Sequence, residues 1–302
     1  LSSGDYTCLA ELIRELIRRL DEKHVSISLP SLRLDSVLKY SLEATQKEKK
    51  TSLTFAPEAG TQRLRDVINK GVTEEDLMSK VSDAFHGGWS SVKLYFMMGL
   101  PTETTEDLDG IADLAKKVVD AYFAVPRGAR AKGLRVVCSA SVFVPKPFTP
   151  FQWEPQDTQE MVREKQSHLR EKLRIKGVTF NYHESDLSYL EACFARGDRR
   201  MGQVLLRAYQ KGCMLDGWTE LFKYDMWREA FAELGIDPAF YAYRRREKDE
   251  IMPWDVIDCG VTKEFLWREK EKAEKAQTTK DCRKGCNGCG LQRFKGVCKY
   301  CG

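Results

Sequence analysis

Cysteines near the end of the chain have the spacing of a metal site. Cys286-x2-Cys289 and Cys298-x2-Cys301 form two CxxC pairs around a short glycine-containing segment, and Cys282 lies four residues before the first pair. Four thiolates at this spacing hold Zn2+ tetrahedrally in zinc ribbons. We therefore predict a structural zinc site made by Cys286, Cys289, Cys298 and Cys301, with Cys282 as a further thiol. An iron–sulfur cluster is the second interpretation.

The remaining cysteines lie singly, at positions 8, 138, 193, 213 and 259 of the 302-residue chain. Scattered thiols without a secretion signal indicate a reducing compartment, so we interpret these five as small buried hydrophobic residues and predict a cytoplasmic protein. The net charge of +4 does not by itself argue for nucleic acid. The longest stretch without a charged residue is too short to cross a bilayer, which argues against a membrane protein.

Glu58 is the acidic residue best placed for chemistry, because it follows an apolar strand pattern and precedes a helical one. A carboxylate at this position has two uses. It can stabilise the N-terminus of the following helix, or it can accept hydrogen bonds from a ribose diol. Gly60, two residues on, allows either a close approach to a ligand or a simple turn.

Three segments repeat the same design, in which an apolar strand runs into a loop rich in Pro and Gly. They are Thr54–Thr61, Lys93–Thr104 and Ser139–Trp153. The loops after parallel strands all open on one end of a barrel, where chemistry collects. The pattern therefore predicts an α/β barrel whose mouth binds a ligand.

The wider pattern alternates strands and helices and then becomes helical. We predict strands at 25–29, 53–55, 92–97, 134–144 and 178–182, separated by helices at 9–20, 34–47, 61–69, 73–85, 104–123 and 158–175. Helices at 186–195, 198–211, 217–222, 225–234 and 262–275 follow. This gives a partial (β/α) barrel over 1–184, a helical extension over 185–276 and a Cys-rich tail over 281–302.

The stretch from Glu58 to Gly71 resembles the fourth-strand motif of the radical S-adenosylmethionine (SAM) enzymes. In that family a Glu or Gln contacts the SAM ribose, and a basic residue twelve positions on reaches the methionyl carboxylate. Those positions are Glu58 and Lys70. Tyr95 falls where the fifth-strand motif carries its polar contact, usually an Asp. The resemblance thus implies SAM contacts at these three residues, at Ser141 on the sixth strand and at Ser3 at the end of the third.

Over essentially its whole length, the chain resembles an uncharacterised radical SAM family with a cobalamin-domain-like N-terminal region. This resemblance implies SAM and a [4Fe–4S] cluster in the intact protein and allows a cobalamin. The CxxxCxxC motif that holds the cluster is absent upstream of these strands, although Cys282, Cys286 and Cys289 have the same spacing in the tail. We therefore expect a longer protein, with the missing N-terminal region supplied in cis or by a partner chain in trans.

The resemblance implies the C-terminal part of a radical SAM enzyme. The intact protein would cleave SAM reductively to a 5′-deoxyadenosyl radical that attacks an unknown substrate, and this chain alone is predicted inactive. The alternative is a non-catalytic barrel with a zinc ribbon that binds RNA or a protein. Arg199-Arg200 and Arg244-Arg-Arg246, near Tyr241 and Tyr243, would then meet phosphates and bases. A solvated or salt-bridged surface is the simpler account of these arginines.

Overall fold

The computed structural model describes residues 6, 8–20, 23, 25, 52–294, 296 and 298. Ser3, Cys301, the predicted helix at 34–47 and all but the first residue of the predicted strand at 25–29 lie outside the described residues. The helix predicted at 9–20 is present as α1 (Leu9–Leu20).

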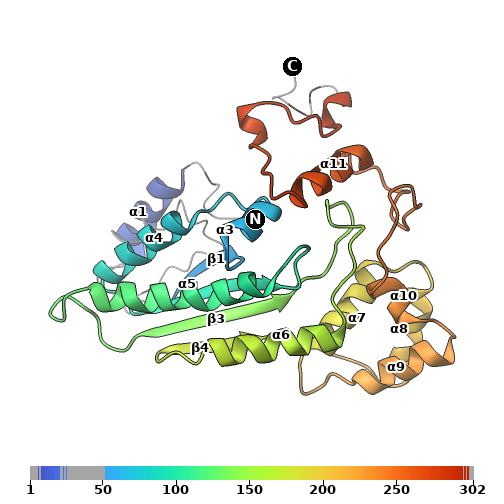
Figure 1. Ribbon diagram of the computed structural model, residues 1–302, viewed down its shortest axis with the longest axis horizontal. Coiled ribbons are helices and arrows are strands. Elements are labelled where there is room, and N and C mark those ends of the chain that lie inside the picture. The colour runs from blue at the N-terminus through green and yellow to red at the C-terminus, as the bar shows by residue number, and fades with distance from the viewer. Residues whose placement is uncertain are drawn as a thin grey trace.

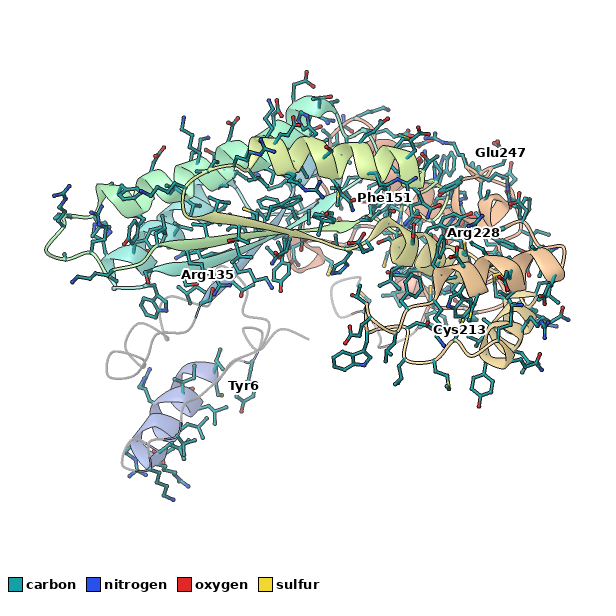
Figure 2. All side chains as sticks on the ribbon, turned by 90° about the horizontal axis from the view of Figure 1, so that it is seen from below. Tyr6, Arg135, Phe151, Cys213, Arg228 and Glu247 are labelled. Atoms are coloured by element: carbon teal, nitrogen blue, oxygen red, sulfur yellow. The ribbon has the colours of Figure 1, made fainter. Side chains whose placement is uncertain are left out.

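In the described part of the chain, four parallel strands form one sheet in the order in which they occur in the sequence. They are β1 (Leu53–Glu58), β2 (Ser91–Met98), β3 (Arg135–Val142) and β4 (Val178–Tyr182). The helices between them are α3 (Gln62–Val67), α4 (Glu74–His86), α5 (Thr105–Ala124) and α6 (Gln159–Lys172). Figure 2 shows α5 and α6 on one side of the sheet and α1 on the other. The prediction of an α/β fold is confirmed, and the arrangement is that of an incomplete parallel barrel.

The sheet buries one face against the helices. Along β2, every second side chain is buried and its neighbours are not, as expected of a strand whose two faces differ. The buried face contributes Leu94, Phe96 and Cys138 to a hydrophobic core that also includes Leu77 of α4 and Ile111 of α5. The alternate residues, including Lys93 and Tyr95, lie on the face that these helices leave uncovered.

Two capping boxes fix where the long helices begin. Thr73 and Asp76 exchange hydrogen bonds at the start of α4, and Thr104 and Asp107 do the same at the start of α5. Each box satisfies backbone N–H groups that have no partner within the helix. The start of α5 is therefore set directly after the loop that follows β2.

The segment after β4 is helical, as predicted, and has its own core (Figure 1). Its helices are α7 (Ser185–Ala195), α8 (Met201–Gln210), α9 (Tyr224–Glu233), α10 (Pro238–Ala242) and α11 (Lys263–Ala273). The helix predicted at 217–222 is wrong, since this stretch contains only turns. The helix α10 was missed, although Asp237 as cap and Pro238 at the first turn are its start signals.

No helix in the described part of the chain is both long and apolar enough to cross a bilayer. Of the five scattered cysteines, three are buried as predicted, whereas Cys8 and Cys259 are exposed. Both lie outside the helices and strands, Cys8 in the turn before α1 and Cys259 in the segment before α11.

Candidate active site

Glu58 ends β1 in a conformation that non-glycine residues seldom adopt. Its φ is 68°, and the register between β1 and β2 shifts between Phe55 and Glu58. A side chain held in the left-handed region costs free energy, typically about 1–3 kcal/mol, and such positions cluster at functional sites. The shift places Glu58 in register with Phe96, close to the carboxyl end of β2.

Lys70, twelve residues further on, returns to Glu58. The Lys70 ammonium donates a hydrogen bond to Glu58 Oε1 at 3.1 Å, and the two side chains remain 32% and 26% exposed. Thr61, and not Glu58, caps α3, because its hydroxyl accepts from the backbone N–H of Leu64 at 3.2 Å. Capping of α3 therefore does not explain why a glutamate stands at position 58. The two residues expected to contact the SAM ribose and the SAM carboxylate lie together.

A buried guanidinium holds the turn between these two residues. Arg65 is 1% exposed and donates to the backbone carbonyl of Ala59 at 3.0 Å. Its own carbonyl accepts from the N–H of Lys70 at 2.8 Å. Burial lowers the pKa of Arg65, which nearby carboxylates partly offset. Arg65 thus connects the backbone after Glu58 with the backbone at Lys70.

The loop after Glu58 is anchored on α5. Gly60 packs so closely on Gly110 that a Cβ at Gly60 would overlap the backbone of Asp107 and Ile111. Asp107 is 2% exposed and its carboxylate accepts hydrogen bonds from Thr61, Arg63 and the N–H of Thr104. Burial alone would raise the pKa of Asp107, but these hydrogen bonds together lower it. The anchor remains ionised at neutral pH and fixes the position of Glu58.

Tyr95 and Ser141 lie on the neighbouring strands. Tyr95 is 40% exposed on the uncovered face of β2, and Ser141 on β3 pairs with Met97, two residues further along β2. The Ser141 hydroxyl donates to the carbonyl of Phe96 at 3.4 Å. In the part of the chain that the structure describes, neither side chain forms a hydrogen bond with Glu58 or Lys70. Three of the four described SAM candidates, Glu58, Tyr95 and Ser141, therefore lie in the carboxyl-terminal half of three adjacent strands, and Lys70 reaches Glu58 from the segment after α3.

A cavity of about 220 Å³ lies elsewhere on this end of the sheet. Its lining includes the loop 99–103 after β2, Asp157, Lys165 of α6 and Lys270 of α11, but none of the predicted SAM residues. Glu103 is buried and accepts from the N–H of Gly99 and from Lys165, which also donates to Asp157. Burial raises the pKa of Glu103, although Lys165 partly offsets it. Sequence reasoning missed this cluster, because isolated charges in loops are typical of a solvated surface.

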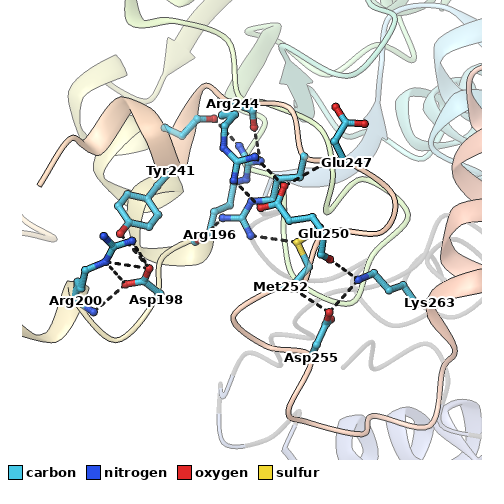
Figure 3. Close-up of polar contacts among 12 residues, drawn as sticks. Arg196, Asp198, Arg200, Tyr241, Arg244, Glu247, Glu250, Met252, Asp255 and Lys263 are labelled. Atoms are coloured by element: carbon cyan, nitrogen blue, oxygen red, sulfur yellow. Dashed lines mark hydrogen bonds and ion pairs between the residues drawn. The ribbon is translucent and has the colours of Figure 1, made fainter.

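Four of the five arginines considered for RNA, Arg200 and the three at 244–246, have partners within the chain, and Figure 3 shows those of Arg200 and Arg244. Arg200 pairs with Asp198, Arg244 with Glu250 and Arg245 with Glu154. Arg246 is 4% exposed and donates to the carbonyl of Arg196. These contacts agree with the salt-bridged account and give no support to an RNA surface at these residues.

The predicted zinc ligands are only partly described. Cys282 and Cys289 are free thiols, whereas Cys286 is disulfide-bonded, a state in which its sulfur does not serve as a thiolate ligand. Within the described residues, no group of three His, Cys, Asp or Glu side chains could hold a metal ion. The metal site of the tail therefore stays a prediction, and it applies to the reduced tail.

Comparison with known proteins identifies the class to which this site belongs. The family model "Radical SAM superfamily" matches residues 1–115, which include Ser3, Glu58, Lys70 and Tyr95. The match confirms the predicted resemblance, in that residues 1–115 are similar to a radical SAM domain.

The chain is also 35% identical over 231 residues to the uncharacterised protein MJ0966 of Methanocaldococcus jannaschii. The match covers 74% of this chain and 48% of the relative, so the chain spans about half the length of the curated relative it matches. No solved structure matches significantly.

Proposed function

We propose that the chain contributes the SAM-binding strands of a radical SAM enzyme. The observation that carries this proposal is the Glu58–Lys70 pair, in which a strained carboxylate meets a lysine at the carboxyl end of β1. The pair lies within the segment that matches the radical SAM family. Its two side chains are partly exposed, so both retain hydrogen-bonding capacity for a ligand.

The residues present fit SAM by their chemistry. The Glu58 carboxylate has a second oxygen that can accept from a ribose hydroxyl, and the Lys70 ammonium has further N–H groups for a carboxylate. Tyr95 offers a ring and a hydroxyl, and Ser141 adds a hydroxyl on the next strand. The chemistry that bound SAM supplies in this family, together with a [4Fe–4S] cluster, is reductive cleavage to a 5′-deoxyadenosyl radical. Zinc in the tail and a cobalamin remain predictions.

The proposal predicts that Glu58→Gln weakens SAM binding by roughly tenfold, because a neutral amide replaces a charged acceptor. Equilibrium dialysis of the chain with labelled SAM measures the change. The matched control is Glu75→Gln, which removes an exposed carboxylate from α4 and should leave binding unchanged. Equal SAM affinity of Glu58→Gln and the unaltered chain would exclude this site.

A separate prediction concerns the tail. Under reducing conditions the chain should bind about one zinc ion, because four thiolates at ribbon spacing bind Zn2+ tightly. Elemental analysis should show the loss of this zinc in Cys289→Ser, while Cys259→Ser, which removes an exposed thiol outside the tail, retains it. Iron and labile sulfide in place of zinc would instead establish an iron–sulfur cluster.

A further inference from the structure

The face of the sheet that α4 and α5 leave uncovered carries polar side chains below its carboxyl-terminal end. Strand register places Lys93 beside Thr54 on one side and Val137 on the other, with Thr179 beyond Val137. One step nearer the mouth, Tyr95, Ser139 and Asn181 form a second row across β2, β3 and β4. Layers that fill a barrel interior are normally dominated by branched apolar residues. The second row instead presents hydroxyl and amide groups, which can bind a ligand.

Lys93 is the charged residue of these two rows. Its ammonium lies 4.6 Å from the centre of the Tyr95 ring, so the side chain leans along β2 toward the carboxyl-terminal end. Across the described residues, no carboxylate lies within ion-pair distance of this ammonium, in contrast to Lys70, which Glu58 neutralises. An ammonium above an aromatic ring, with a threonine on one neighbouring strand and a row of polar side chains one step nearer the mouth, is a ready partner for anionic oxygens.

We propose that Lys93 recognises an anionic group, a carboxylate or a phosphate, of the substrate. The inference rests on the proposed function, because it assigns to substrate the part of this face that lies below Glu58 and Ser141. Lys93 supplies the charge, and Ser139 and Asn181, one row toward the mouth, supply neutral hydrogen bonds. The anionic group then lies deeper in the barrel than SAM, and the rest of the substrate extends toward Glu58 and Ser141.

The test is a titration of the whole chain with small anions, followed by the backbone amide chemical shifts of Tyr95, Ser139 and Asn181. Acetate and inorganic phosphate are the probes, at constant ionic strength, and acetamide is the neutral counterpart. We expect saturable shifts with an anion and none with acetamide. Stronger binding of acetate assigns a carboxylate, and stronger binding of phosphate assigns a phosphate.

Variants separate Lys93 from general charge effects. Lys93→Gln should weaken anion binding by roughly tenfold or more, and Lys93→Arg should retain most of it. Lys116→Gln, on the exposed side of α5, should change nothing. Absence of saturable shifts at these amides, or equal shifts in Lys93→Gln, overturns the proposal.

SAM dialysis distinguishes this failure from failure of the proposed function. Lys93→Gln should bind SAM nearly as well as the unaltered chain does, because Lys93 lies below Glu58 and Ser141 and meets Tyr95 from the side away from the mouth. A loss of SAM affinity in Lys93→Gln would place Lys93 in the SAM site and overturn its assignment to substrate. Unchanged SAM affinity in Glu58→Gln refutes the SAM site but not the anion site. The anion site is tested separately, by the chemical-shift changes in the titration.

Discussion

Gly60→Ala is expected to destabilise the fold by about 3 kcal/mol, at the upper end of the cost of overpacking. The added methyl group would overlap the carbonyl oxygen of Asp107 and the amide nitrogen of Ile111, which belong to the rigid backbone of α5. Such a clash is relieved only if the loop after β1 moves away from the helix. Denaturant unfolding at neutral pH measures the loss of stability.

The matched control for this variant is Gly202→Ala on α8. A Cβ at Gly202 meets nothing within 4 Å, so this change should be neutral or stabilise by up to about 1 kcal/mol. We also expect Gly60→Ala to lose SAM binding, because the displaced loop carries Glu58. Wild-type stability of Gly60→Ala would show that the loop does not pack on α5 as described.

The limits of sequence reasoning are visible at this same loop. The motif placed Glu58 and Lys70 in one site, and the structure joins them at 3.1 Å. The sequence alone does not distinguish a close approach to a ligand from a turn at Gly60, because its packing partner Gly110 lies fifty residues away. Packing between distant glycines leaves no periodic signal in a sequence, so only the structure gives this reason for the glycine.

Strands were easier to predict than the helical extension. The strand predicted at 178–182 is β4 with the same bounds, because its alternation and flanking turns are local features. The stretch 217–222 is predicted to be a helix, but its backbone hydrogen bonds form isolated turns. One example is the bond from Leu221 N–H to the Trp218 carbonyl. Short segments depend on tertiary packing more than on propensity. Burial also depends on tertiary packing, and the prediction that Cys8 and Cys259 are buried is wrong.

Lys270→Met should destabilise the fold by about 3–5 kcal/mol, because it breaks a buried ion pair and leaves a carboxylate partly uncompensated. Lys270 and Glu154 are each 5% exposed, and the Lys270 ammonium lies 3.1 Å from Glu154 Oε1. Arg245 also contacts Glu154, at 2.7 Å, so the carboxylate would keep one partner. Because this second partner remains, the loss of folding stability should be nearer to about 3 kcal/mol.

The pair also tests how the chain divides into units, since Glu154 lies in the predicted barrel segment and Lys270 in the predicted helical extension. If the two segments unfold as one, Lys270→Met should shift a single transition toward lower denaturant. Lys275→Met, at an exposed position just after α11, should change stability by no more than about 0.5 kcal/mol. Glu154→Gln combined with Lys270→Met should cost less than the sum of the two single changes, because the charges are coupled. Two separate transitions, with only one moved by Lys270→Met, would show instead that the segments fold independently and that this buried pair does not join them.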